Sequence, residues 1–253
     1  MNIFLVTLRK ELLEQWRTRR LIVVAIVLIF FGLLSPAAAR YTPELMKLLP
    51  SGAGMAKLMP PPTAMDAVKQ YLKNLSQFGL VLALLVTMGS VAQEKDRGTA
   101  AMMLVKPLPR ATFLAAKFAA LTLTFLLSLA AAALAGFFYT TFLFSAPDVS
   151  RWIALNGLIL VYIMVQVAIT LLCSVIAKSQ IAAGGLAFAA ITALAFIAAI
   201  PGFGKYLPGQ LLGWAGELMA GIPATHWATL FACLGIISTA LFGAWFLFER
   251  QEL

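Results

Sequence analysis

Long runs of apolar residues, separated by short polar or charged stretches, dominate the pattern of this chain. Leu21 to Ala39 contains no charged residue, and Phe118 to Pro147 contains none either. A helix of about 20 apolar residues, rising 1.5 Å per residue, crosses the bilayer's hydrocarbon core of about 30 Å. The pattern therefore predicts an all-α membrane protein with six transmembrane helices. The expected spans are about 21–39, 75–93, 112–144, 152–177, 181–200 and 227–248.

Composition and charge support the same class. Of the 253 residues, 62% are hydrophobic and only 11% are charged, whereas a soluble domain carries about 25% charged residues. The net charge of +9 fits an excess of basic residues facing the cytoplasm and anionic lipid, so we expect no nucleic-acid partner. Cys173 and Cys233 both fall in apolar runs and are expected to be small buried hydrophobes rather than a disulfide.

The positions of lysine and arginine predict the orientation. With both termini in the cytoplasm, the short outer loops hold only Arg151 and Lys205, and most other basic residues face inward. The long outer segment 40–74 carries further basic residues and weakens this contrast without reversing it. We therefore expect a multi-pass protein of the cytoplasmic (inner) membrane of a prokaryote, with both termini inside.

The first segment, 1–20, has the pattern of an amphipathic helix that lies flat in the cytoplasmic headgroup layer. Apolar residues recur at intervals of three or four: Leu5, Leu8, Leu12 and Trp16. Charged residues occupy the other faces: Arg9, Lys10, Glu14 and Arg17. The simplest role is an anchor before the first span. The alternative is a contact surface for a cytoplasmic partner, formed by Arg9, Glu14, Trp16 and Arg17.

Two segments on the outer side are predicted to contain short helices. In segment 40–74 the run Pro60-Pro61-Pro62 breaks any helix, and the residues after it form an apolar stripe that leads into the second span. Segment 201–226 is interrupted by glycine and proline but is too apolar for a solvated loop. A pair of short re-entrant or interfacial helices satisfies both properties.

Motifs for catalysis or cofactor binding are absent from the sequence. It contains no G-x-x-x-x-G-K-[ST] and no H-E-x-x-H, so we expect no enzyme activity, no cofactor and no metal on this chain. His226 is the only histidine and is expected to be an interfacial polar residue; Glu217 lies at the headgroup layer or lines a substrate exit. Lys117 is the charged residue nearest to a span interior, and we expect it to extend toward the interface.

A charged segment, 94–111, separates the second and third spans. Gly98-Thr99 allows a turn, and Thr99 can cap a short helix over "AAMMLV" at 100–105. Pro107 and Pro109 end that helix. Its apolar side, with Met102 and Met103, has no lipid to face, so it is expected to be a docking site for another protein.

This segment, E-K-D-R-G-T…L…K-P-L-P-R…F-L-A-A-K, resembles the stretch after the second span in permeases of the type-2 ATP-binding cassette exporter family. The order of the other elements is also similar to that family. The resemblance implies a single transmembrane domain over 1–253 that pairs with a second permease subunit, identical or related. It also implies a separate cytoplasmic ATPase, which binds ATP and Mg²⁺. By the resemblance, the coupling residues are Glu94, Arg97, Gly98, Thr99, Pro107 and Arg110.

Other interpretations remain open at this point. The basic residues of segment 94–111 can serve only to set the topology. The chain can also be an assembly or signal-transmitting factor, moved by an ATPase and acting on an extracytoplasmic partner without export. A carrier that needs no ATPase is a third class, against which the scarcity of intramembrane charge argues. The apolar spans suit a hydrophobic or amphipathic substrate.

Overall fold

The computed structural model describes residues 3–48, 60–96, 98, 109–200, 202–223 and 225–251, and the regular structure of these residues is helical throughout. The long helices are α2 (Arg20–Lys47), α4 (Ala64–Thr87), α7 (Arg110–Leu143), α8 (Val149–Ile176), α9 (Gln180–Ala198) and α11 (Trp227–Glu249). The short ones are α1 (Ile3–Arg17), α5 (Ala92–Asp96), η1 (Gly204–Tyr206) and α10 (Gly209–Met219). Within the described ranges, 6 stretches are long and apolar enough to cross a membrane, with α4 and α5 counted together. This confirms the predicted six-span all-α fold.

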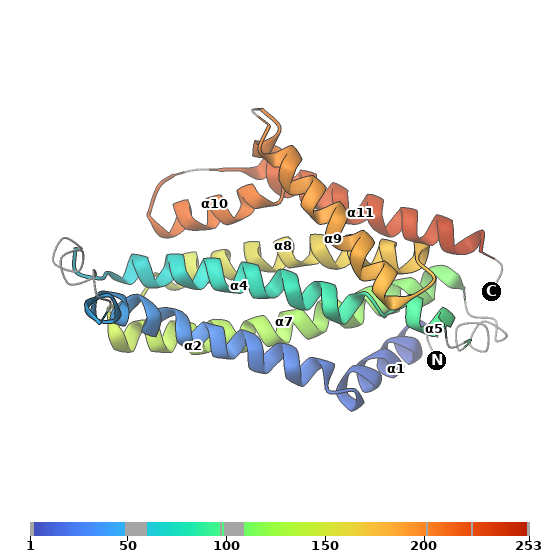
Figure 1. Cartoon of the computed structure of the whole chain (residues 1–253), viewed down its shortest axis with the longest axis horizontal. Coiled ribbons are helices and arrows are strands. Elements are labelled where there is room, and N and C mark those ends of the chain that lie inside the picture. The colour runs from blue at the N-terminus through green and yellow to red at the C-terminus, as the bar shows by residue number, and fades with distance from the viewer. Residues whose placement is uncertain are drawn as a thin grey trace.

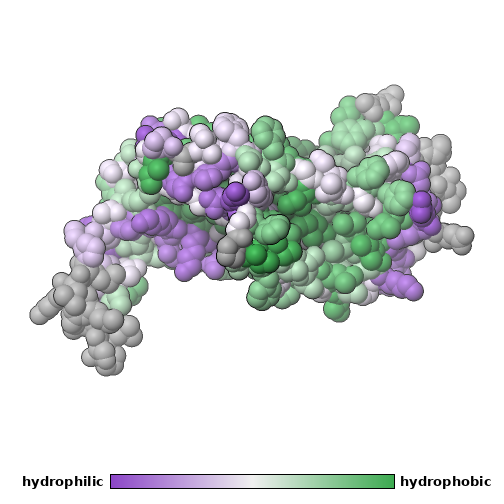
Figure 2. Space-filling view, turned by 90° about the horizontal axis from the view of Figure 1, so that it is seen from above, coloured by the Kyte–Doolittle hydropathy of each residue, from purple (hydrophilic) through white to green (hydrophobic). Residues whose placement is uncertain are grey.

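α2, α4, α7, α8 and α11 run roughly along the long axis of the molecule, and α9 crosses this bundle obliquely (Figure 1). Both chain ends lie at one end of this bundle, next to α1 and α5, and we call it the terminal end. The turn between α7 and α8 lies at the opposite end, which we call the distal end. Hydrophilic residues gather toward both ends of the long axis, and a hydrophobic region lies between them (Figure 2). This distribution fits a bundle that crosses a membrane along its long axis.

Two helices extend beyond the predicted spans at the distal end. α2 continues to Lys47 and accommodates Pro36 and Pro43 inside the helix. α4 begins at Ala64, where Thr63 and Asp66 form a capping box that satisfies backbone groups of the first turn. The short helix predicted before the second span is therefore the first part of the spanning helix itself.

Small residues allow α2, α4 and α7 to approach closely. A Cβ atom added at Gly32 of α2 would lie 2.8 Å from the backbone oxygen of Ala132 in α7. One added at Gly136 of α7 would lie 2.7 Å from the ring of Tyr71, a fully buried residue of α4. In a membrane, where apolar side chains gain little by leaving lipid, such close backbone packing stabilises helix contacts.

A side chain of α8 fixes the break between α4 and α5. The Ser174 hydroxyl oxygen accepts hydrogen bonds from the backbone N–H groups of Val91 and Ala92, each at 3.0 Å, and donates one to the carbonyl of Met88 at 2.9 Å. These bonds satisfy backbone groups that the interrupted helix leaves unpaired. The direction of α5, and hence the position of Glu94, is set by this contact with α8.

Candidate functional site

A cluster of charged side chains lies at the terminal end, where α1, α5 and α7 meet. Lys117 of α7 is at its centre: its ammonium nitrogen lies 3.0 Å from a carboxylate oxygen of Glu11 and 2.8 Å from one of Glu94. Lys117 is only 3% exposed. A buried charge costs several kcal/mol unless it is paired. The two ion pairs therefore hold α1 and α5 against the first third of α7.

A second lysine completes the cluster. Lys10 lies 3.0 Å from Glu11, 3.3 Å from Glu14 and 3.5 Å from Glu94. Burial alone would lower the pKa of Lys10, but the adjacent carboxylates, Glu11 foremost, outweigh it and raise that pKa. Lys10 therefore stays protonated at neutral pH. We use the term ion cluster for these five residues: Lys10, Glu11, Glu14, Glu94 and Lys117.

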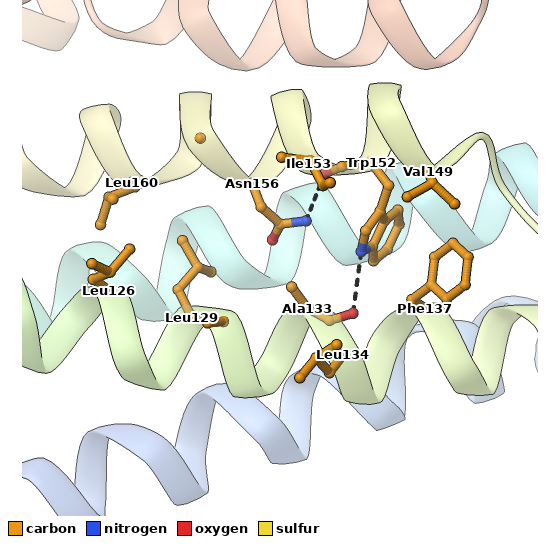
Figure 3. A pocket seen from close by; sticks show the side chains of 12 residues that line it. Leu126, Leu129, Ala133, Leu134, Phe137, Val149, Trp152, Ile153, Asn156 and Leu160 are labelled. Carbon is orange, nitrogen blue, oxygen red and sulfur yellow. Dashed lines mark hydrogen bonds between the residues drawn. The ribbon is translucent and has the colours of Figure 1, made fainter.

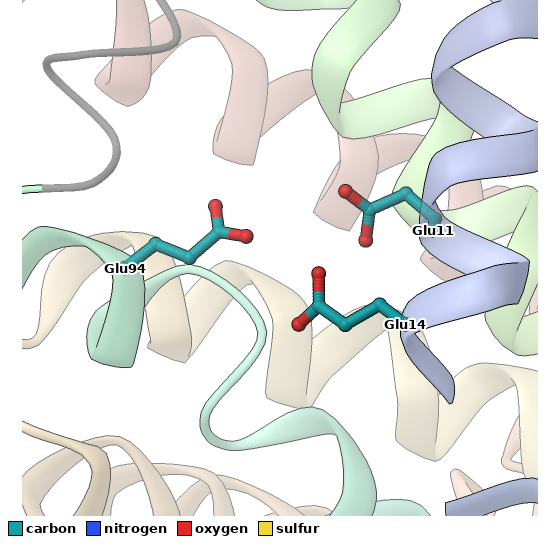
Figure 4. A group of neighbouring side chains, drawn as sticks. All are labelled: Glu11, Glu14 and Glu94. Atoms are coloured by element: carbon teal, nitrogen blue, oxygen red, sulfur yellow. The ribbon is translucent and has the colours of Figure 1, made fainter. Parts of the chain in front are cut away.

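The three glutamates point toward one another from two elements, two from α1 and one from α5 (Figure 4). Their nearest carboxylate oxygens all lie within 4.8 Å of one another, a spacing at which carboxylates can also bind a metal ion. Here the ammonium groups of Lys10 and Lys117 supply the positive charge between them. These contacts hold α1 and α5 together by charge.

Polar contacts extend the ion cluster along α1. Gln15 of α1 accepts a hydrogen bond from the Thr124 hydroxyl of α7. At the start of α2, the Arg20 guanidinium donates to the Gln93 side-chain oxygen at 3.3 Å. Polar contacts between α1 and α7 thus extend from Lys117 to Thr124, about two turns further along α7.

The sequence pattern did not indicate which side of α1 packs against the protein. In the structure Thr7, Glu11 and Gln15 form a buried stripe at four-residue spacing. This side of α1 is buried because its charged residues have partners on α5 and α7, which lie far from α1 in the sequence. Leu5 and Trp16 remain exposed.

Lys117 is more enclosed than the sequence indicated. α1 covers it and supplies Glu11 as a partner. Its ammonium group also lies 4.8 Å from the centroid of the Phe113 ring. One indication was present in the sequence: Lys117 is the last ionisable residue before a long charge-free run, with Glu94 at the end of the preceding span.

The two flanks of segment 97–109 are attached to the ends of other helices. Lys95 donates to the carbonyl of Val175 at the end of α8 and, at 3.2 Å, to the side chain of Gln251. The Arg110 guanidinium donates to the carbonyls of Phe248, Glu249 and Gln251 at the end of α11. Cations at helix C-termini satisfy the last carbonyls and oppose the helix dipole. The residues on both sides of segment 97–109 are therefore attached to other helices: Lys95 to the end of α8, and Arg110 to the end of α11.

The predicted site residues have different positions. Glu94 and Glu14 belong to the ion cluster, Arg110 holds the end of α11, and Arg9 and Arg17 are exposed on α1. Gly98 adopts a left-handed conformation, with φ of 67°, which suits a turn. Five predicted residues, and with them the predicted coupling helix, lie outside the described residues: Arg97, Thr99, Met102, Met103 and Pro107.

Two residues that the sequence analysis discussed separately, Glu217 of α10 and His226 just before α11, are in contact. His226 lies 2.9 Å from a carboxylate oxygen of Glu217, and both side chains are partly exposed. The ring of Trp214 on α10 lies 6.0 Å from that of His226. His226 and Glu217 thus hold the start of α11 against α10, which is consistent with the interfacial role expected for both.

Comparison with known proteins finds similarity over most or all of the chain. The sequence matches the family described as ABC-2 family transporter protein over residues 5–211, a range that contains every member of the ion cluster. A similar protein is YxlG of Bacillus subtilis (strain 168), described as an uncharacterized transmembrane protein. It is 28% identical over 259 residues, which cover 100% of this chain and 99% of the relative.

Proposed function

This chain belongs to the ABC-2 family of transporter proteins, and we propose that it is the permease subunit of an exporter. In this proposal a substrate crosses the cytoplasmic membrane of a prokaryote, and a separate ATPase subunit binds ATP and Mg²⁺ and supplies the energy. The permease itself catalyses no reaction. It pairs with a second permease subunit, and both of its termini lie in the cytoplasm.

The observation that carries the proposal is the ion cluster. Through Lys117, it joins α1, α5 and α7 by ion pairs of 2.8 and 3.0 Å at one buried point. Segment 97–109 begins directly after α5 and ends at α7. A force applied to this segment by a partner would therefore reach α1 and α7 together. A coupling site needs such a rigid connection between the docking surface and the spans.

The surroundings of the cluster support docking of a partner at the terminal end. Arg9, Trp16 and Arg17 are exposed on α1 at that end. An ATPase subunit would contact this surface together with segment 97–109, whose Met102 and Met103 are apolar residues between charged ones. Both termini lie at this end as well (Figure 1), and this agrees with the orientation that the basic residues favour.

The test is co-expression with a candidate ATP-binding cassette ATPase, preferably one encoded beside this chain. The permease carries an affinity tag, and the complex is reconstituted in lipid nanodiscs. Co-elution measures docking, and the ratio of ATPase rates with and without the permease measures coupling. The test variant is Lys117→Met, and the matched control is Lys178→Met, which removes an exposed lysine from the turn between α8 and α9.

We expect both variants to co-elute with the ATPase. Lys117→Met should reduce the ATPase response at least about fivefold, the effect of about 1 kcal/mol of lost coupling, and Lys178→Met should not. If no ATPase co-elutes, the proposed function is wrong. If Lys117→Met retains the full response, the ion cluster is not the coupling element.

A second measurement separates export from the assembly or signal-transmitting alternative. Candidate apolar and amphipathic compounds are added to the complex, and ATP-dependent accumulation inside inverted membrane vesicles is measured. Accumulation that stops in vesicles without the ATPase supports export. An ATPase rate that responds only to an added extracytoplasmic protein, with no compound accumulating, favours the alternative.

A further inference from the structure

An elongated cavity of about 550 Å³ lies between α7 and α8 in the distal half of the bundle (Figure 3). It runs beside residues 126–137 of α7 and 149–160 of α8. Its floor is buried: Leu129 and Trp152 are 2% and 4% exposed. Its rims are open, since Leu134 and Ile153 are 73% and 66% exposed. The cavity is therefore a slot that opens sideways between two spanning helices.

The walls of the slot are hydrocarbon, and the polar groups among them already have partners. The Trp152 indole N–H donates to the carbonyl of Ala133 at 3.1 Å. The Asn156 amide donates to the carbonyl of Trp152 at 2.9 Å and accepts from the Tyr71 hydroxyl at 2.7 Å. A polar ligand would lose its hydration here without compensation. The slot selects an apolar occupant.

The dimensions of the slot match one leaflet of a bilayer. Eleven helical steps from one end of the slot to the other, at 1.5 Å each, give a length of about 16 Å. Half of a hydrocarbon core of about 30 Å is about 15 Å. Because α8 begins at Val149, the slot reaches from the distal end of the span to about the middle of the membrane. This is the depth that the acyl chain of one leaflet occupies.

We propose that this slot binds one acyl chain of a membrane phospholipid from the distal leaflet. The volume of about 550 Å³ lies within the usual range of ligand pockets, about 300–1,000 Å³. The side opening lets a chain enter from the bilayer, while its buried floor holds the chain between α7 and α8 rather than on the outer surface. Binding requires neither ATP nor the ATPase subunit.

Gly157 provides a direct test, because a Cβ atom added there meets nothing within 4 Å and it lines the slot. Gly157→Leu therefore adds side-chain volume to the slot from a position where the Cβ atom itself meets no clash. Gly185→Leu is the matched control: Gly185 lies in spanning helix α9, and its added Cβ also meets nothing within 4 Å. A second filling variant, Ile153→Trp, replaces an exposed rim residue and serves if Gly157→Leu does not fold.

The full chain is reconstituted into phosphatidylcholine vesicles that contain a phosphatidylglycerol with a diazirine in the middle of one acyl chain. After irradiation, the labelled peptides are quantified by mass spectrometry. We expect labelling of residues 126–137 and 149–160 to exceed that of α9. It should fall about tenfold in Gly157→Leu, the loss expected when about two methylene groups lose their contacts, and stay unchanged in Gly185→Leu.

Two outcomes would overturn the proposal. Labelling of the slot that equals that of α9 and is insensitive to both filling variants would mean that lipid meets only an ordinary membrane-facing surface. Efficient disulfide cross-linking between two copies that carry Ile153→Cys would mean that a second chain covers the slot instead. Loss of labelling in both filling variants, with the control unchanged, supports the acyl-chain site.

Discussion

Replacing Lys117 with methionine removes the positive charge that separates two carboxylates in a largely buried site. Each of its ion pairs, at 2.8 and 3.0 Å, corresponds to about 6 kcal/mol of Coulomb energy at an effective dielectric constant of about 20. Desolvation of the three groups offsets most of this in the native protein. Loss of one partner, however, leaves the others buried and uncompensated, which typically costs about 3–5 kcal/mol.

Lys10 moderates the loss, because it also contacts Glu11 and Glu94 and is partly exposed. We therefore expect Lys117→Met to lower the free energy of unfolding by about 3 kcal/mol, the lower end of that range. Adding Glu94→Gln removes one of the two facing charges. The double variant should therefore be more stable than the single one, by about 1–2 kcal/mol, although it lacks one more native group.

The assay is reversible unfolding of the purified chain in mixed micelles, with SDS as the denaturant and helix content as the signal. All four members of the cycle are measured: the parent, Lys117→Met, Glu94→Gln and the double variant. A loss below about 1 kcal/mol in Lys117→Met, the value of an exposed pair, would refute the assigned burial. A double variant less stable than Lys117→Met would refute the charge argument.

Three further changes compare buried with exposed groups. Glu14 is partly exposed, so Glu14→Gln should change the free energy of unfolding by less than about 0.5 kcal/mol in the same titration; a larger loss would contradict its peripheral position. Gly32→Ala brings a methyl group to 2.8 Å from a backbone oxygen of α7 and should cost about 1–3 kcal/mol. Gly185→Ala, where the added Cβ atom meets nothing within 4 Å, should leave the stability unchanged. Equal melting temperatures for Gly32→Ala and Gly185→Ala would contradict the close packing of α2 on α7. Arg110→Ala removes hydrogen bonds to the last carbonyls of α11 and should cost about 1–2 kcal/mol, with faster amide hydrogen exchange near the end of α11. Arg250→Ala, at an exposed position, is the control. Amide hydrogen exchange near the end of α11 that is equally fast in Arg250→Ala and Arg110→Ala would contradict the attachment of α11 by Arg110.

The spans could be predicted from the sequence because the bilayer imposes a length. A charge-free run such as 21–39 has few alternatives to a crossing helix. The helix ends were harder to predict. α2 continues through Pro36 and Pro43 to Lys47, because a proline inside a spanning helix is tolerated where neighbouring helices and side chains satisfy the freed groups. The charge-free run alone places the end at Ala39, before Arg40.

The ion cluster could be predicted only in part. Glu94 was singled out from the pattern of segment 94–111, but its partner Lys117 was assigned to the interface. Glu11 lies 106 residues from Lys117 in the sequence, and no local pattern joins residues so far apart. The four-residue spacing of Thr7, Glu11 and Gln15 was visible and indicates one helix face. Only the tertiary contacts reveal that this polar face is the buried one.

The connections of segment 97–109 bear on which helices can move together. Through Glu94 it is linked to α1 and α7, and through Lys95 and Arg110 it is linked to the ends of α8 and α11. Ser174 of α8 additionally holds the break before α5. Of the six spanning stretches, α8 has the largest buried share.

Displacement of the segment would therefore be transmitted directly to α8 as well as to α7. Because these two helices form the walls of the slot at the distal end, a shift of one against the other would change the width of the slot. Under the proposed function, the motion that couples an ATPase subunit to the spans would thus alter the contact between the bundle and lipid at the distal end.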